Sequence, residues 1–101
     1  MTTDLSLVTA ANFSAYLNQE MPIRFSNEVV LPAELIEIKE TANHTDADRT
    51  PFYLVFRTGQ KNGYYQQGIY TIEYPDGNSF ALFLVPLGPD GKGMRYEAVF
   101  S

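Results

Sequence analysis

The chain has 101 residues, no cysteine, one histidine and a formal net charge of −5 at pH 7. This length fits one domain over residues 1–101, with residues 1–6 as a loose polar start. The lack of cysteine excludes a disulfide, a thiolate metal site and a cysteine nucleophile, and the acidic balance argues against non-specific binding to nucleic acid or to an anionic membrane. No apolar run approaches the ~20 residues that span a bilayer, and the N-terminus lacks the pattern of a signal peptide, so we expect a cytoplasmic protein.

The first predicted element is a short amphipathic helix near the N-terminus. Thr9 suits the N-cap position, and Phe13, Tyr16 and Leu17 recur at the i, i+3, i+4 spacing of one helix face. A helix of about two to three turns is too short to be stable alone, so it must pack on the rest of the domain. We expect it to cover one face of the apolar run Phe80–Val85.

Three strands are predicted in the middle of the chain. They cover Ile23–Phe25, Ala33–Lys39 and Phe52–Arg57. Pro32 interrupts the apolar run around the second strand, whose apolar residues do not alternate strictly. This pattern is typical of an edge strand, with a β-bulge near Leu35 and Ile36. The polar segments 41–51 and 59–68 are predicted to be long loops.

The last third of the chain predicts a three-stranded antiparallel meander. Its strands run over Gly68–Tyr74, Phe80–Leu87 and Met94–Phe100, separated by the turn sequences Pro75–Asn78 and Gly88–Gly93. We expect the final strand to pair with Phe80–Val85. Both faces of Phe80–Val85 are apolar, so both need cover: by a helix, by the far wall of a small barrel or by a second subunit. The expected shared core comprises Leu54, Phe56, Ile69, Phe80, Leu82, Leu84, Tyr96, Ala98 and Phe100.

Together the elements indicate a mainly β domain of the α+β kind. The expected architecture is a small, partly open antiparallel β-barrel or a curved sheet of five to six strands, with one short N-terminal helix packed on it. A flat two-layer α+β sheet is the alternative.

The sequence holds no convincing catalytic or metal-binding constellation. His44, Asp46 and Asp48 lie close together, but their loop lacks the glycine and the closing glutamate of a calcium loop. No serine lies in a Gly-x-Ser-x-Gly elbow. Gly88–Gly93 is rich in glycine, but a strand follows it where a phosphate loop requires a helix. We therefore predict no catalytic residue, no cofactor and no metal site, and a protein that is not an enzyme.

Three residues are candidates for binding a partner. Tyr64 and Tyr65 are adjacent tyrosines in a long loop, and tyrosines supply amphipathic contact area at low entropic cost. The alternative is that one or both fold back over the mouth of the barrel. Arg95 lies on the outer face of the final strand, where we expect it to pair with Glu73 or Glu97 or to anchor a partner.

The C-terminal motif resembles a family of small, uncharacterised bacterial domains of unknown function. The resemblance rests on Gln67–Tyr70, Tyr74-Pro75, Leu82–Pro86, Gly88-Pro89-Asp90 and Gly93–Phe100. The family pattern usually has His where this chain has Tyr74, and a shorter loop where Lys61–Gln66 lies. The resemblance implies a setting near phage-tail-like collar or fibre proteins, and it provides no catalytic residue.

Three functions are compatible with these observations. The first is a non-enzymatic structural or protein-interaction module, accessory to a phage-tail-like assembly, which binds a protein partner or further copies of itself. The second is a small-ligand-binding β-barrel, and the third is a hydrolase with a carboxylate site. A cavity of ~300–1,000 Å³ would favour a ligand, whereas a filled interior with an apolar exterior patch would favour assembly.

Overall fold

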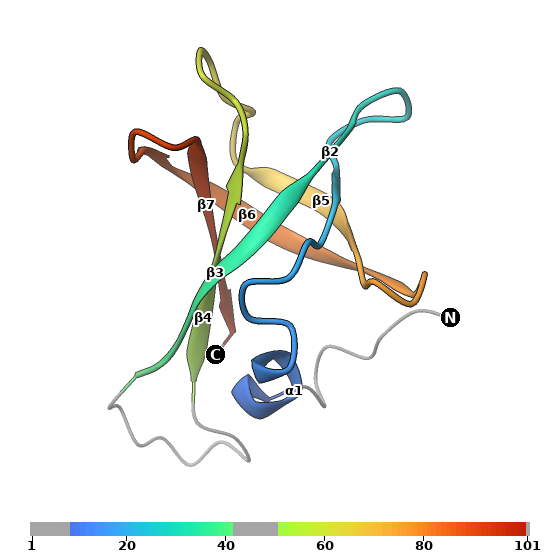
Figure 1. Cartoon of the computed structure of the whole chain (residues 1–101), viewed down its shortest axis with the longest axis vertical. Coiled ribbons are helices and arrows are strands. Elements are labelled where there is room, and N and C mark those ends of the chain that lie inside the picture. The colour runs from blue at the N-terminus through green and yellow to red at the C-terminus, as the bar shows by residue number, and fades with distance from the viewer. Residues whose placement is uncertain (1–8, 42–50, 101) are drawn as a thin grey trace.

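The structure, a computed structural model, describes residues 9–41 and 51–100. Its elements are α1 (Ala10–Ser14), β1 (Ile23–Arg24), β2 (Val30–Leu31), β3 (Ala33–Glu40), β4 (Phe52–Thr58), β5 (Gly68–Glu73), β6 (Ser79–Pro89) and β7 (Met94–Phe100) (Figure 1). The prediction of a mainly antiparallel β domain with one short helix is confirmed. The prediction of five to six strands is wrong, because the part of the chain that the structure describes forms seven, of which β1 and β2 have two residues each.

The strands form one sheet in the order β2-β1-β5-β6-β7-β4-β3, with antiparallel neighbours throughout. The sheet curls, so that β2 and β3 lie at its two ends although only Pro32 separates them in the chain. Within the described residues no ladder joins β2 to β3. The barrel is therefore open, in agreement with the prediction of a partly open barrel or curved sheet.

Residues 18–21 cover the first part of the β3 edge. The Asn18 and Met21 N–H groups donate hydrogen bonds to the carbonyl oxygens of Leu35 and Ala33, each at 2.7 Å. The Leu35 N–H in turn donates to the Gln19 carbonyl oxygen at 3.1 Å. Because these bonds occupy backbone groups that an edge strand would otherwise expose, this part of β3 cannot pair with another chain.

The long strand β6 changes its pairing partner half-way along. Its first half, Ser79–Leu84, pairs with β5, and its second half from Val85 pairs with β7. The expected pairing of the final strand with Phe80–Val85 is therefore wrong except at Val85, which lies opposite Glu97. The curvature of the sheet explains the difference, since a strongly curved strand can serve two neighbours in succession.

Two irregularities interrupt the ladders. The register between β3 and β4 shifts between Leu35 and Glu37, which confirms the predicted β-bulge. A second shift lies between Pro86 and Gly88 on β6, where proline donates no N–H and Gly88 has a φ of 107°. Gly88 accepts this left-handed conformation because it has no Cβ.

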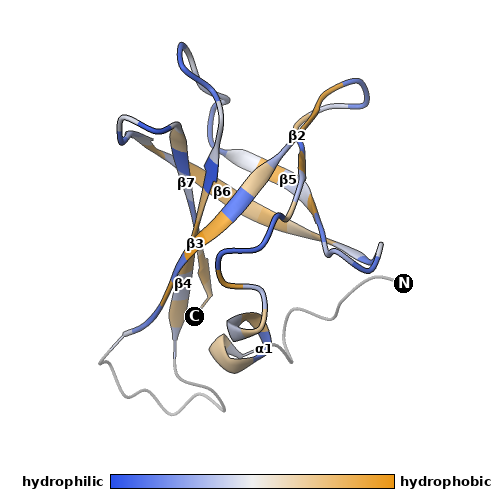
Figure 2. Ribbon diagram, viewed as in Figure 1, coloured by the Kyte–Doolittle hydropathy of each residue, from blue (hydrophilic) through white to orange (hydrophobic). Residues whose placement is uncertain are grey.

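The inward faces of the strands form one apolar core. Its largest fully buried side chains include Phe13, Leu35, Phe52, Leu54, Phe56, Ile72, Phe80, Leu84 and Tyr96. The rings of Phe52 and Phe100 stack with their centroids 4.5 Å apart. Figure 2 shows that hydrophobic residues recur along the strands, whereas the tips of the β4–β5 and β6–β7 loops are hydrophilic. Of the expected core residues, only Ile69 is misplaced, because its side chain faces outward and is 72% exposed.

The helix closes one end of the curved sheet. It is shorter than predicted, and it begins after Thr9, whose N–H donates a hydrogen bond to Asn12 Oδ1 at 2.7 Å. Phe13 inserts among the aromatic rings of the core, with its centroid 5.7 Å from that of Phe80. In Figure 1, α1 lies at the end of the sheet away from the β1–β2 and β4–β5 loops. The helix lies against β3, and Phe13 also packs on Phe52 of β4 and Phe100 of β7, so α1 fills the inner side of the curved sheet and does not cover the outer face of β6.

Candidate functional site

The outer face of β5 and β6 carries exposed apolar side chains. Because side chains alternate along a strand, Phe80, Leu82 and Leu84 point into the core, and Phe83 points outward. Phe83 lies directly opposite Ile69 in the β5–β6 register. The two side chains are 51% and 72% exposed, respectively. Such a cross-strand pair of large apolar residues normally faces a core.

The apolar surface continues along β6 toward its C-terminal end. Val85 lies two residues beyond Phe83 on the same face, and Leu87 is exposed after the irregularity at Pro86. Tyr64 from the β4–β5 loop, 60% exposed, lines one groove of about 340 Å³ with Val85 and a second of about 310 Å³ with Leu87. We call Tyr64, Ile69, Phe83, Val85 and Leu87 the outer apolar strip.

Several charged side chains lie beyond one end of the outer apolar strip. Arg57 and Arg95 lie directly opposite each other on β4 and β7, and Lys92 is exposed in the adjoining hairpin loop. Asp90 partly compensates this charge, since its Oδ2 lies 2.7 Å from Arg57 Nη2. The hydrogen bond from Arg57 lowers the pKa of Asp90 to about 2, with help from the Lys92 N–H. Glu34 lies opposite Arg57 on β3, and Glu97 lies on the same face of β7 as Arg95, so the charges at this end are mixed.

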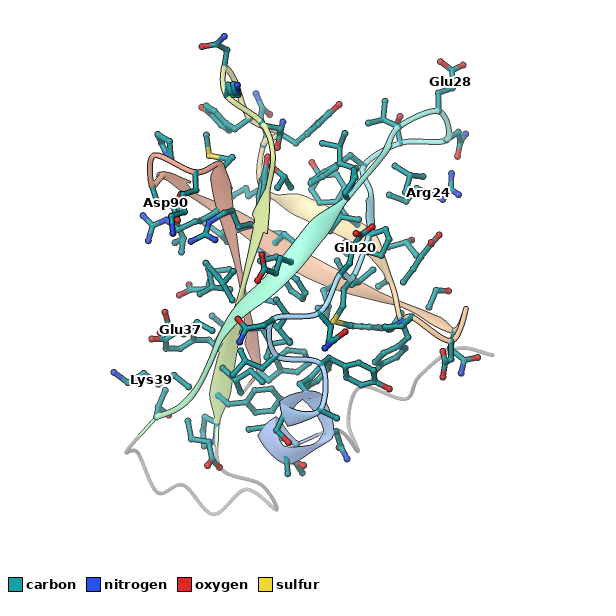
Figure 3. All side chains as sticks on the ribbon, in the orientation of Figure 1. Glu20, Arg24, Glu28, Glu37, Lys39 and Asp90 are labelled. Carbon is teal, nitrogen blue, oxygen red and sulfur yellow. The ribbon has the colours of Figure 1, made fainter. Side chains whose placement is uncertain are left out.

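The other end of the strip is acidic. Glu73 is the last residue of β5 and lies opposite Ser79, the first residue of β6. Asp76 is exposed in the turn between these strands. Arg24 Nη2 on β1 lies 3.8 Å from Glu73 Oε2, which is a long contact between partly exposed groups. Since this end has two carboxylates and one cation, one negative charge is left uncompensated. Figure 3 shows Arg24 and Asp90 on opposite sides of the molecule, which marks the separation of the two ends.

A comparison with models of protein families shows the family to which the chain belongs. The model of a family described as a domain of unknown function, DUF6916, matches residues 8–100. The chain belongs to the DUF6916 family. Searches of curated proteins and of solved structures found no match. The family therefore supports the expectation of a small domain of unknown function, and its description names no activity or ligand.

Tyr64 and Tyr65, the two tyrosines of the DUF6916 domain that were predicted to bind a partner, point in different directions. Tyr64 is exposed in the outer apolar strip. Tyr65 stacks on Phe25 at a centroid distance of 4.3 Å, and its N–H donates a hydrogen bond to Tyr96 Oη at 3.0 Å. Burial raises the pKa of Tyr96, which also donates to Gln60 Oε1 at 2.8 Å. Tyr65 thus anchors the loop from which Tyr64 projects.

Arg95 has a different environment from the one predicted. Its Nε donates to the Gly88 carbonyl oxygen at 3.4 Å, and in the described part of the chain no carboxylate lies within ion-pair distance of it. The expected pairing with Glu73 or Glu97 is wrong, because Glu73 lies beside Arg24 at the other end of the strip. Arg95 remains a candidate for contact with a partner. The sequence did not identify Ile69 and Phe83 as site residues, although the two apolar faces of β6 gave the signal.

A further groove of about 550 Å³ lies near the start of β3. Glu20, Glu34, Arg57 and Lys92 are among the residues that line it, so its charges are mixed. Across residues 9–41 and 51–100, no three histidine, cysteine or carboxylate side chains cluster as metal ligands would. His44, Asp46 and Asp48 lie outside the described residues. No helix in the described part of the chain has the length and apolar character needed to cross a membrane.

Proposed function

We propose that the DUF6916 domain is a non-enzymatic protein-interaction module that binds through the outer apolar strip. The observation that carries this proposal is the outward-facing pair Ile69 and Phe83, large apolar side chains that are 72% and 51% exposed at the centre of a regular sheet. Contiguous apolar patches of this kind on a soluble domain mark interaction sites.

The composition of the strip also favours a protein partner. Tyr64 is a rigid amphipathic side chain between two shallow grooves, and tyrosine is enriched in protein interfaces. Tyr65 fixes the base of its loop through the stack on Phe25, which lowers the entropic cost of ordering Tyr64 on binding. Arg95, on the outer face of β7, provides a polar rim to the apolar centre.

The small-ligand alternative receives less support. The interior of the curved sheet is filled by the side chains of Phe13, Phe52, Phe56, Phe80 and Tyr96, all of them fully buried. Two of the three grooves described above are lined by residues of the outer apolar strip. We also propose a structural accessory role in a phage-tail-like assembly of bacterial origin, in keeping with the resemblance in the C-terminal motif, and a cytoplasmic location.

Site-specific photo-crosslinking tests the proposal. A photoreactive phenylalanine analogue is introduced at Phe83 in one variant and at Lys39 in another. Lys39 serves as the control position because its side chain is also exposed but lies on β3, at the far end of the strand order. We expect protein crosslinks from position 83 in native cells and none above background from position 39. Equal crosslinking from both positions, or none from position 83, would contradict the proposed binding face.

A further inference from the structure

We infer that Asn62, at the tip of the β4–β5 loop, is a site of spontaneous deamidation in the folded protein. In this reaction the side-chain amide becomes a carboxylate, so the chain gains one negative charge without the action of an enzyme. Asn62 is followed by Gly63, and no other asparagine of the chain precedes a glycine. Glycine favours the reaction because it has no Cβ to hinder the approach of its own amide nitrogen to the asparagine side chain.

The reaction needs only water beyond the chain itself. The amide nitrogen of Gly63 loses its proton to solvent and attacks Cγ of Asn62. A new C–N bond forms, the bond from Cγ to the side-chain nitrogen breaks, and ammonia leaves with a proton from solvent. Water then opens the resulting succinimide ring to aspartate, or to isoaspartate, in which the backbone is longer by a methylene group. The net change converts an amide and water into a carboxylate and ammonium.

The fold leaves both reacting groups free. Asn62 and Gly63 are exposed, and in the described part of the chain neither the Asn62 side chain nor the Gly63 N–H makes a hydrogen bond. A Cβ added at Gly63 would meet no atom within 4 Å, so no other described segment packs there. Figure 1 shows this loop projecting from the sheet at the end away from α1. The two groups can therefore reach the geometry of attack by rotation about a few single bonds.

Two anchors allow the tip of the loop to move while the domain stays folded. Before the tip, Gln60 Oε1 accepts a hydrogen bond from Tyr96 Oη at 2.8 Å. After the tip, the ring of Tyr65 stacks on that of Phe25 at a centroid distance of 4.3 Å. Residues 61–64 lie between these anchors and make no hydrogen bond within the described chain. Opening of the tip therefore does not require global unfolding.

Two other asparagines provide comparisons inside the same chain. The residue after Asn18 is Gln19, whose N–H donates a hydrogen bond to the Tyr16 carbonyl oxygen at 2.9 Å. The side-chain amide of Asn78 donates to Asp76 Oδ2 at 3.2 Å. In each case a group that would have to react is already hydrogen-bonded, and the following residue has a side chain that hinders the attack. We therefore expect both asparagines to outlast Asn62.

The Asp-Gly pairs of the chain can form the same ring in principle, but the fold opposes it. In Asp76-Gly77, the Gly77 N–H donates to the Tyr74 carbonyl oxygen at 3.0 Å, so the attacking nitrogen is occupied. In Asp90-Gly91, the hydrogen bond from Arg57 keeps the carboxyl group ionised at neutral pH, and a carboxylate resists nucleophilic attack. The reactive site is therefore confined to Asn62 among these pairs.

The new charge would lie next to the exposed tyrosine of the outer apolar strip. Only Gly63 separates Asn62 from Tyr64. The consequence for binding rests on the proposed function: a carboxylate this close to Tyr64 loses hydration when a partner covers the tyrosine, so the deamidated chain should bind that partner more weakly. Deamidation would then limit the time for which one molecule of the domain keeps its full affinity.

Mass spectrometry of the aged protein tests the inference. The native chain is incubated in mildly alkaline buffer beside a sample held unfolded in guanidinium chloride, and peptides from both are sequenced by fragmentation. We expect Asn62 in the native chain to convert at a rate within about tenfold of that in the unfolded chain, because opening of the tip costs little free energy. Asn18 and Asn78 should remain amides in the native chain. Asn62→Gln, whose longer side chain disfavours ring closure, should abolish the conversion without changing thermal unfolding.

Two results would overturn the inference. If Asn62 remains an amide in the native chain while it converts in the unfolded chain, the fold protects it. If Asn18 or Asn78 converts as fast as Asn62 in the native chain, the free groups at the loop tip are not what decides the site.

The effect on binding is measured separately with Asn62→Asp, which carries the charge from the start, and with Asn62→Gln as the neutral control. Fewer crosslinks from position 83 with Asn62→Asp than with Asn62→Gln would support the loss of affinity, and equal crosslinking would contradict it. No crosslinking in the parent chain would contradict the proposed function, whereas the mass spectrum of Asn62 does not depend on a partner.

Discussion

Adjacent residues on β6 provide a matched test of which face of the strand is buried. Leu84 is fully buried and points into the core, whereas Phe83 points outward and is 51% exposed. We compare Leu84→Ala with Phe83→Ala in the same chain. Because both substitutions lie on one strand with similar backbone conformation, the difference between them reports side-chain burial rather than strand propensity.

The expected magnitudes follow from the exposed fractions. Truncating a fully buried leucine removes its transfer free energy and leaves a cavity, so Leu84→Ala should lower the free energy of unfolding by ~2–5 kcal/mol. Complete burial of a phenylalanine contributes ~1.5–3 kcal/mol, and about half of this is available to a side chain that is half exposed. Phe83→Ala should therefore cost only about 1 kcal/mol in the monomer.

Urea unfolding followed by circular dichroism measures both values. The experiment uses the lowest practical protein concentration, because self-association would add stability that depends on concentration. The slope of the free energy against urea should remain equal in parent and variants if only the native contacts change. A larger loss for Phe83→Ala than for Leu84→Ala under these conditions would refute the assigned orientation of β6, and with it the outer apolar strip.

The β6–β7 hairpin provides the remaining predictions. A Cβ at Gly93 would lie 1.8 Å from the Thr58 carbonyl oxygen, so Gly93→Ala should lower the free energy of unfolding by at least ~1–3 kcal/mol, measured by urea unfolding, and a neutral effect would contradict the close approach of these backbones. The hydrogen bond from Arg57 lowers the pKa of Asp90 from 3.8 to about 2. A carboxyl group whose pKa is lowered in the folded state stabilises the fold above its unfolded pKa, and this stability is lost as the pH falls through the folded pKa. Asp90→Asn should therefore lower the midpoint of thermal unfolding at neutral pH, and its deficit relative to the parent should shrink between pH 3.8 and about 2; a deficit that does not depend on pH would refute the charge contribution.

Local sequence signals predicted the main features of the fold. Turn chemistry at Pro75–Asn78 and Gly88–Gly93 correctly separated β5, β6 and β7. The irregular apolar pattern near Leu35 correctly predicted a β-bulge. These features depend on backbone preferences of a few neighbouring residues, which a sequence carries directly. The strand predicted over Ile23–Phe25 corresponds to β1, whereas β2 was not predicted as a separate strand, since so short a segment has no period to detect.

The candidate surface could be predicted only in part. The sequence showed that both faces of Phe80–Val85 are apolar and need cover, and it named Tyr64 and Arg95 as residues for a partner. It did not show that Tyr64 is exposed whereas Tyr65 packs inward, because these orientations depend on Phe25 and Tyr96, which lie far away in the chain. The position of Arg95 at the opposite end of the strip from Glu73 depends in the same way on pairings among several strands.

The sequence by itself determined which residues of a strand share a face, because side chains alternate with a period of two. Only the tertiary structure decided which face is inside. Ile69 illustrates the limit: both faces of its strand contain an apolar residue, and the register with Phe83 together with the packing of Tyr70 and Ile72 leaves it exposed. The choice between two such faces depends on the curvature of the whole sheet and on which side encloses the core, a property of long-range pairing that no local pattern contains.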